Sequence, residues 1–320
     1  TGYVELFAHG GTAEVDGSIE ALGGFVETSS RYFNIEEGSS IKAGEWLIDP
    51  VDITIDEALA GVIETALGTG DVTIETENYL GSSNSTVDTS YNETSSDGII
   101  TDGDIYVNSD ITWDTAQKLT LNAADSIYIN SSITAEDDNG KLTLHYGQGA
   151  AAASNDANYF LNAPINLKAG DNFFTKLGND GTETTWTVIT ELGSAGSTTG
   201  TDLQGINGNL SGNYVLGTNI NASATSTWNG DKGFDPIGYY NINTNTSFAF
   251  TGTFDGLGHT IDGLYIKRSD EDDIGLFGYT DGASISNVGL TNVDITGDDY
   301  VGGLVGANYR SDITNSYVTG

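Results

Sequence analysis

Cysteine and methionine are absent from the 320-residue chain, which has only 3 prolines and only 10 lysines and arginines. Without cysteine, the chain has no disulfides, no thiolate catalysis and no cysteine-bound zinc or iron–sulfur site. The few basic residues stand against 46 aspartates and glutamates, so the formal net charge is −36. Such a charge argues against a nucleic-acid or anionic-membrane partner. Stability must come from packing and backbone pairing.

Long hydrophobic runs are absent too. No stretch approaches about 18 consecutive apolar residues, so the sequence predicts no membrane-spanning helix. The chain opens at Thr1 in an alternating pattern already under way, without a basic start or an apolar leader, which we interpret as an internal fragment. Hydrophobic residues still make up 37% of the chain, enough for a sizeable core, and the 43 glycines predict many tight turns.

Matching segments define a short repeat in the middle of the chain. The segment 104–111 (DIYVNSDI) returns 22 positions later at 126–133 (SIYINSSI), and 118–121 (KLTL) returns 23 positions later at 141–144. Each alternates apolar and polar residues, as a strand with one buried face does. A fixed period of this length is typical of stacked coils. We therefore predict an all-β fold, an elongated parallel β-helix, with an antiparallel sandwich as the alternative.

A second repeat lies near the end of the chain. The segment 274–278 (IGLFG) returns at 302–306 (GGLVG), and 285–287 (ISN) returns at 313–315 (ITN), both at an offset of 28. We expect these glycines to adopt positive φ at the corners of the coils, and the leucines and isoleucines to stack in ladders.

Some segments break the strand pattern. Residues 56–67 have leucine and isoleucine at helical spacing after a capping aspartate, which predicts a short helix. Residues 202–207 predict a weaker helical turn. The Gly/Ser/Thr stretch 193–200 is the best internal boundary. Residues 82–96 and 147–158 are predicted to be loops outside the stack.

The segments 24–29 (GFVETS) and 46–55 (WLIDPVDITI) resemble the shaft of filamentous-haemagglutinin-type large exoproteins of Gram-negative bacteria, and a block within 186–217 is similar to another stretch of that family. From 234–238 (FDPIG) and 250–256 (FTGTFDG) onward, the chain resembles the GLUG motif of bacterial surface proteins. These motifs mark a fold more specifically than a function.

The resemblance implies a right-handed parallel β-helix, export by two-partner secretion through an outer-membrane partner, and a role in adhesion, haem acquisition or contact-dependent competition. It also suggests a haemagglutinin-like shaft over residues 1–200. Residues 201–320 would continue the β-helix with GLUG-type repeats, and the two parts would form one continuous solenoid.

Carboxylates two positions apart on a strand point the same way, at a separation that an inverting glycosidase pair could use. Three such pairs occur, namely Asp102 with Asp104, Glu75 with Glu77, and Asp270 with Asp272. Because 46 acidic residues produce such pairs by chance, we expect these to be solvated surface instead.

Acidic runs at 270–273, 136–138 and 298–299 offer the hard oxygen ligands that Ca²⁺ prefers. No known calcium-loop motif occurs, so loosely bound calcium is expected in preference to a specific site. The three histidines, His9, His145 and His259, lack metal-type spacing and are interpreted as structural.

Aromatic residues could form a platform on which a sugar stacks, although packing in the core or at corners is the favoured interpretation. The candidates are Trp113, Trp186, Trp228, Tyr239 and Tyr240. Six Asn-x-Ser/Thr sequons leave glycosylation an open question. They begin at Asn84, Asn92, Asn130, Asn209, Asn221 and Asn245.

The sequence thus predicts a structural shaft segment of a secreted bacterial surface adhesin or extracellular fibre that presents a distal binding region. We assign no catalytic, cofactor-binding or metal residue and expect no enzyme. Expected partners are a receptor or glycan on a host cell, neighbouring cell or matrix, and self-association into fibres is possible. The alternatives are a polysaccharide-degrading β-helix enzyme and a calcium- or glycan-binding module within the fibre.

Overall fold

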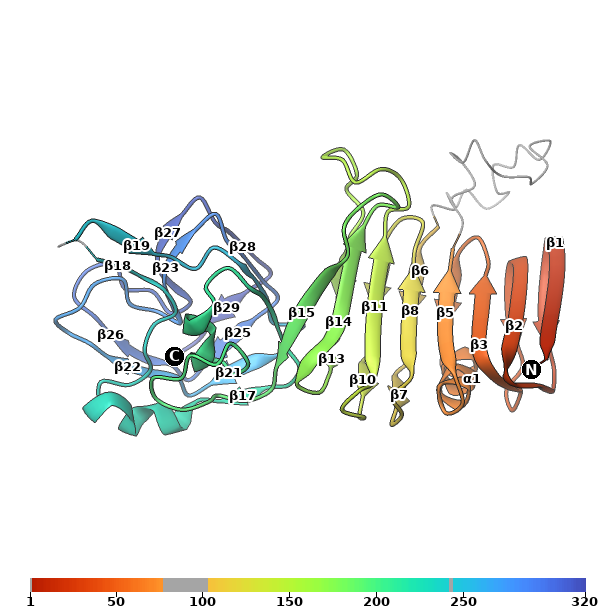
Figure 1. The fold of residues 1–320 in the computed structure, drawn as a ribbon, viewed down its shortest axis with the longest axis horizontal. Coiled ribbons are helices and arrows are strands. Elements are labelled where there is room, and N and C mark those ends of the chain that lie inside the picture. The colour runs from red at the N-terminus through yellow and green to blue at the C-terminus, as the bar shows by residue number, and fades with distance from the viewer. Residues whose placement is uncertain (1, 77–102, 242–243) are drawn as a thin grey trace. The chain divides into compact units, whose positions relative to one another are not determined.

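The computed structural model describes residues 2–76, 103–241 and 244–320, and strands dominate it, so the predicted all-β class is confirmed (Figure 1). The chain divides into two compact units. The first unit comprises residues 1–163 and 174–184, and the second comprises residues 164–173 and 185–320. The predicted domain boundary between residues 200 and 201 stays a prediction.

The first unit is built on a main sheet and two smaller ladders of strands. The main sheet has the order β1-β2-β3-β5-β8-β11-β14, and the larger of the two ladders has the order β12-β9-β6-β4. The main-sheet strands are β1 (Tyr3–Val15), β2 (Ser18–Ile35), β3 (Ser40–Asp49), β5 (Asp71–Glu75), β8 (Lys118–Asn122), β11 (Lys141–Tyr146) and β14 (Gly170–Leu177). The ladder strands are β4 (Ile53–Ile55), β6 (Ile105–Val107), β7 (Ile111–Trp113), β9 (Ile127–Ile129), β10 (Ile133–Ala135) and β12 (Tyr159–Leu161).

The sequence repeat of the first unit is a structural repeat. Strand β6 pairs with β9 in parallel, and β7 pairs with β10, so each apolar residue of 105–111 lies beside its equivalent 22 positions later. Strand β8 pairs with β11 in the same way at an offset of 23. The register places identical apolar residues side by side in the core: Ile105 and Ile127 are partners, and both are fully buried. The two predicted repeat markers are therefore neighbours in space.

The predicted helix is α1 (Glu57–Leu67). It begins as expected, because the Asp56 side chain accepts a hydrogen bond from the Leu59 N–H at 3.0 Å. Its apolar face, with Ile63 and Leu67 fully buried, packs against β3, β5 and β7. The helix thus fills the interior beside the sheet in place of a strand.

The second unit consists of short strands and two 3₁₀ segments. The 3₁₀ segment η1 (Gln204–Gly208) agrees with the predicted turn at 202–207, and η2 is Ser223–Gly230. The strands are β13 (Ile165–Asn166), β15 (Thr184–Ile189), β16 (Asn213–Leu216), β17 (Ile220–Asn221), β18 (Tyr239–Asn241), β19 (Thr246–Phe248), β20 (Thr253–Asp255), β21 (Thr260–Asp262), β22 (Tyr265–Lys267), β23 (Phe277–Asp281), β24 (Ser284–Ser286), β25 (Gly289–Thr291), β26 (Asp294–Thr296), β27 (Val305–Tyr309), β28 (Asp312–Thr314) and β29 (Tyr317–Val318).

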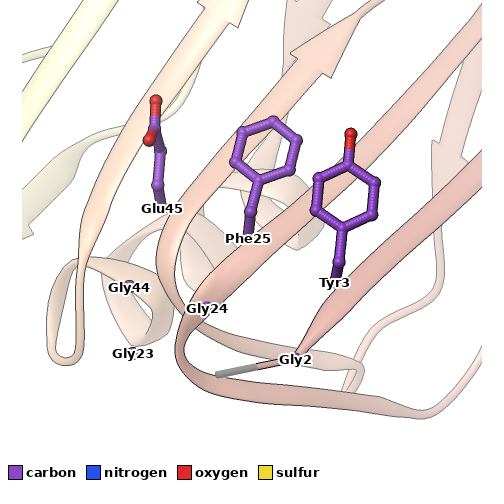
Figure 2. A pocket seen from close by; sticks show the side chains of 7 residues that line it. All are labelled: Gly2, Tyr3, Gly23, Gly24, Phe25, Gly44 and Glu45. Carbon is purple, nitrogen blue, oxygen red and sulfur yellow. The ribbon is translucent and has the colours of Figure 1, made fainter.

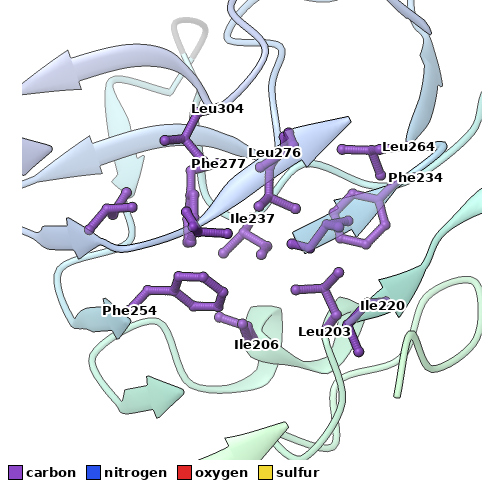
Figure 3. Packing of buried hydrophobic residues seen from close by; sticks show 14 of the residues in the cluster. Leu203, Ile206, Ile220, Phe234, Ile237, Phe254, Leu264, Leu276, Phe277 and Leu304 are labelled. Carbon is purple, nitrogen blue, oxygen red and sulfur yellow. The ribbon is translucent and has the colours of Figure 1, made fainter. Parts of the chain in front are cut away.

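Parallel ladders recur in the second unit, in the orders β15-β16-β20-β24-β28 and β17-β21-β25-β29. The offset of 28 is confirmed where β23 pairs with β27 and β24 pairs with β28. Strands β18 and β19 instead form an antiparallel hairpin. Buried side chains from the ladders and from η1 meet in one core, in which Ile206, Phe254 and Phe277 are fully buried (Figure 3).

The expectation for the glycines of the second repeat was wrong. Those at 275, 278, 302, 303 and 306 do not have positive φ; a Cβ on Gly306 would lie 2.6 Å from the backbone of Asp273, so close packing of adjacent coils requires glycine there. Asparagine occupies equivalent left-handed corners instead, at Asn287 (φ 54°) and Asn315 (φ 48°). Asparagine tolerates this conformation because its side chain can hydrogen-bond locally. Here Asn315 Nδ2 donates to Asn287 Oδ1 at 3.3 Å.

Candidate functional site

The acidic run 270–273, predicted as a possible calcium corner, lies beside a buried arginine. Arg268 donates from Nη1 to Glu271 Oε2 at 2.8 Å, from Nη2 to Asp235, and from Nε to the Phe234 carbonyl at 3.2 Å. Lys232 Nζ lies 2.6 Å from Glu271 Oε1 and 3.7 Å from Asp270 Oδ1. The protein's own cations therefore already pair with two carboxylates of this run, Asp270 and Glu271.

The electrostatics of this cluster, formed by Lys232, Asp235, Arg268, Asp270 and Glu271, follow from these contacts. Burial alone would raise the pKa of Glu271, but hydrogen bonds from Lys232 and Arg268 outweigh it and hold that pKa below its usual value. Burial raises the pKa of Asp273, against the N–H of Tyr240, which donates to its Oδ2 at 3.3 Å. The hydrogen bonds therefore stabilise the ionised form of Glu271, whereas burial favours the protonated form of Asp273.

Neighbouring carboxylates also have protein partners. Asp272 Oδ1 accepts the Asp299 N–H at 3.2 Å, and in the run 136–138 Asp137 Oδ1 accepts the Asn139 N–H at 2.8 Å. Over the ranges 2–76, 103–241 and 244–320, no group of three or more metal-ligating side chains comes together. Specific calcium binding gains no support from the geometry of these residues.

The predicted carboxylate pairs are only partly visible. Asp102 and Glu77 lie outside the described residues, so two of the three pairs cannot be placed. Asp104 accepts hydrogen bonds from the Tyr106 hydroxyl at 2.8 Å and from the Ser126 N–H at 2.9 Å. In the third pair, Asp270 faces Lys232 and Asp272 accepts a backbone N–H. These contacts tie carboxylates to the scaffold and leave a catalytic pair without support.

Two histidines can be placed, and the side chain of His9 lies outside the described set. His259 is buried, and its Nε2 lies 2.9 Å from the Ile165 carbonyl, to which it donates in the neutral form. Burial lowers the pKa of His259. Burial also lowers the pKa of His145, against Glu183, whose Oε2 lies 2.8 Å from its Nε2. Neither His145 nor His259 is part of a metal site among the described residues.

The predicted aromatic platform does not assemble. Trp113 and Trp186 are buried, and Trp228 stacks on Phe234 with the ring centroids 6.4 Å apart. Tyr239 is exposed and stacks on Phe248 of the adjacent hairpin strand at 4.7 Å. For the tryptophans, packing was the correct interpretation.

Sequence reasoning missed another aromatic row, on the outside of the ladder β12-β9-β6. Tyr106 stacks on Tyr128 at 4.8 Å, and Tyr128 stacks on Phe160 at 5.1 Å, with each pair in register. Because the rings cover one another's faces, the row stabilises the ladder and is not a sugar platform. The tyrosines of the 22-residue repeat were the signal for it.

An amide row lies beside this aromatic row. Asn130 Nδ2 donates to Asn108 Oδ1, and Asn162 Nδ2 donates to Asn130 Oδ1, both at 2.7 Å. Asn130 begins one of the sequons, and it is exposed, as are the sequon residues Asn209, Asn221 and Asn245. Asn84 and Asn92 lie outside the described residues. Exposure leaves four sequons open to modification and assigns none.

A shallow hollow of about 550 Å³ lies where strands β1, β2 and β3 bend at glycines (Figure 2). Gly2, Gly24 and Gly44 are among the glycines that line it, and a Cβ on Gly24 would lie 2.0 Å from the Gly2 carbonyl. Tyr3 and Phe25 stack at 5.2 Å along one side, and Glu45 follows in register. The hollow is open, with one carboxylate and two rings, and no reactive pair lines it.

Sequence reasoning also missed a group of three lysines in the first unit. Lys118 and Lys141 begin strands β8 and β11 and lie side by side in register. Lys176 of β14 and Lys118 are both close enough to His145 to oppose its protonation. The 23-residue repeat KLTL, which places one lysine on the next, was the signal that could have found them.

Comparison with known proteins gives two matches. Residues 297–320 match the family model described as the GLUG motif, which confirms that resemblance in the last part of the chain. Halomucin of Haloquadratum walsbyi (strain DSM 16790 / HBSQ001) is 37% identical over an alignment of 198 residues that covers 58% of this chain. The chain spans only 2% of the length of that relative. No solved structure matches the chain.

Together the two matches point to an extracellular or surface-associated protein, a part of a large surface protein. They do not support the filamentous-haemagglutinin type, so that finer resemblance is corrected. The residues that carried it, such as 46–55, alternate in the way that any strand of a stacked parallel ladder requires. The implied outer-membrane secretion partner stays a prediction. In the part of the chain that the structure describes, no helix is long and apolar enough to cross a membrane.

Proposed function

We propose that this chain is a load-bearing shaft segment of a large extracellular or surface-associated protein, built as a right-handed parallel β-helix. The observation that carries the proposal is the register: strand after strand repeats its position, from β4 through β6 and β9 to β12, with like residues in line. Parallel strands joined by crossovers are nearly always right-handed, which gives the hand of the coil.

The mechanism is mechanical. Backbone hydrogen bonds between successive coils run along the stack, so tension along it is borne by whole ladders, while the apolar rows inside resist separation. Rows of Tyr and Asn outside add further contacts between coils. The chain has 46 acidic residues against 10 basic ones, and this excess of negative charge keeps such a shaft soluble. We propose a non-catalytic role, with the receptor or glycan contacted by other parts of the protein.

Engineered cysteines test the stack cleanly, because the native chain has none. Thr112 and Thr134 pair in register between β7 and β10, at a spacing that suits a disulfide. We expect Thr112→Cys with Thr134→Cys to cross-link on mild oxidation. The matched control, Thr112→Cys with Glu136→Cys, is shifted by two residues and should stay reduced. Preferential cross-linking of the shifted pair would contradict the register.

Single-molecule pulling from the two ends then tests load-bearing. A stack of coils should break in steps that each release roughly 22 residues or a multiple, at up to about 3.6 Å per residue. The disulfide-locked variant should lose the length of one such coil. A chain that extends smoothly, without force peaks, would rule out the shaft function even if the register were right.

A further inference from the structure

The outward face of the main sheet in the first unit has its charges sorted by strand. This outer face consists of the alternate residues of β1, β2, β3, β5, β8, β11 and β14 that point away from the buried rows. Figure 1 shows these strands side by side. Residues such as Val26, Trp46 and Ile74 point inward and are fully buried, so their neighbours along each strand point outward. The outer face can therefore be read row by row.

Strands β1 to β5 make the outer face acidic on one side. One row runs Tyr3, Phe25, Glu45, Asp71 in register, and further carboxylates flank it. The outward carboxylates of this acidic half are Glu5, Glu27, Glu45, Asp49, Asp71 and Glu75. The acidic half ends at β5.

Strands β8 to β14 make the other side basic. Lys118 and Lys141 lie side by side, and Lys176 lies near His145, so this basic half holds three of the chain's ten lysines and arginines. This half also holds the carboxylate of Glu183, which lies 2.8 Å from His145 Nε2, so it is basic by the excess of its three lysines. In a chain of net charge −36, this concentration of cations on three neighbouring strands is unexpected. Like charges directly opposite each other also destabilise a sheet, so packing does not explain it.

The middle row of the outer face is charged on β1 and β2, at Glu5 and Glu27, and uncharged from β3 onward. From β3 it passes in register through Leu47, Thr73, Thr120 and Thr143. Small uncharged side chains in the centre allow a flat surface to approach closely, as the cores of protein interfaces do.

We propose that the outer face pairs with the outer face of a second copy of this chain, about a two-fold axis that runs parallel to the strands between β5 and β8. Rotation about this axis reverses the order of the strands and keeps their rows. It places Glu45 opposite Lys141 of the second copy, and Asp71 opposite Lys118. Each contact occurs twice, as in any isologous dimer. The proposal rests on the proposed shaft function, because it joins two shafts side by side.

The size and charge of the outer face set the strength of this dimer. The axis pairs six of the seven strands, from β2 to β14. At about 4.8 Å spacing and about five residues in length, they cover roughly 500 Å² on each copy, which is the size of a weak interface. The net charge of each copy repels the other over long distances, whereas the facing pairs act at contact. Salt shortens the screening length to about 8 Å at 0.15 M and about 3 Å at 1 M. Association should therefore be strongest between these concentrations and weaker at about 10 mM.

Charge reversal on each half tests the pairing by sedimentation equilibrium at about 0.3 M NaCl. The basic-half variant is Lys118→Glu with Lys141→Glu, and the acidic-half variant is Glu27→Lys with Glu45→Lys. Asp71 is left intact because its Oδ1 accepts the Lys118 N–H at 2.9 Å. Each variant alone should lose at least about tenfold in association constant, since like charges then face each other. An equimolar mixture should regain most of the dimer, because Glu45 and Asp71 of the basic-half variant then face the native Lys141 and Lys118 of the acidic-half variant.

Off-face variants with the same charge changes serve as controls. Lys168→Glu with Lys267→Glu, and Asp294→Lys with Asp312→Lys, change exposed residues of the second unit and should dimerise as the native chain does. Circular dichroism checks that every variant is folded. A native chain that stays at 33.5 kDa up to about 1 mM at every salt concentration would overturn the proposal. So would a mixture no more associated than its components. Either result leaves the cysteine test of the shaft untouched.

Discussion

Removal of the Arg268 side-chain charge should destabilise the second unit far more than removal of the adjacent Lys267 charge. The Arg268 side chain is 9% exposed, and Arg268→Met keeps most of its buried stem but removes the guanidinium, which bonds to Phe234, Glu271 and Asp235. Lys267→Met is the matched control, because it deletes the same charge from an exposed neighbour.

The structure sets the magnitude. The Phe234 carbonyl, in a fully buried residue, loses a donor, which costs about 1–3 kcal/mol. The carboxylates of Asp235 and Glu271 are 37% and 36% exposed, so solvent screens them and each lost ion pair costs at most about 1 kcal/mol. Arg268→Met should therefore cost about 1–5 kcal/mol, by summing these effects, and Lys267→Met should stay within about 0.5 kcal/mol.

Equilibrium urea unfolding at pH 7 and pH 3, followed by tryptophan fluorescence, measures the effect. Glu271 has a lowered pKa in the folded state, so its pairing stabilises the fold above its ordinary value of 4.5 and is lost as the pH falls through the folded pKa. The gap between native chain and Arg268→Met should thus shrink at pH 3 but not close, because the carbonyl remains without its donor. Equal losses for Arg268→Met and Lys267→Met at pH 7 would refute this reasoning.

Three further predictions concern other parts of the fold. Burial lowers the pKa of His259 below 6.5, so its unfolded form binds protons first and stability should fall as the pH drops below 6.5; His259→Gln should flatten the melting temperature between pH 8 and pH 5, and an unchanged slope would argue against this histidine as the cause. Ile127→Ala, in a fully buried ladder, should cost about 2–5 kcal/mol in urea unfolding, whereas exposed Thr54→Ala should change little; equal effects would contradict the stacked core. Asp56→Ala should cost about 1 kcal/mol by loss of the cap of α1, and Asp56→Asn should retain most of it; a loss as large for Asn as for Ala would point away from capping.

Sequence reasoning was strongest where the chain repeats at a constant interval. The pairs Ile105–Ile127 and Leu119–Leu142 followed directly from offsets of 22 and 23, because one coil there has one length. The helix followed from local chemistry alone, through the Asp56 cap and the apolar spacing. Parallel β class and these neighbours were therefore readable without coordinates.

The second unit was harder to predict because its coils vary in length. Ile220 lies beside Ile261, 41 positions later, while Thr187 lies beside Tyr214, only 27 later. Insertions such as the hairpin β18–β19 make the coils unequal in length, so the sequence shows no constant period there. For the same reason, the contact between Arg268 and Asp235, 33 residues apart, could not be inferred. Whether a charged residue is buried depends on which loops of successive coils come into contact, and no local sequence pattern predicts those contacts.

The left-handed asparagine corners have a consequence for how such a chain lengthens. Asn287 and Asn315 occupy the same place in successive coils, and each coil contacts chiefly the coils before and after it. An in-frame duplication of 28 codons would therefore add one coil, with its asparagine corner, its amide contact and its strands of each ladder. Because each coil contacts chiefly its neighbours, such a duplication should require no compensating change in distant parts of the protein.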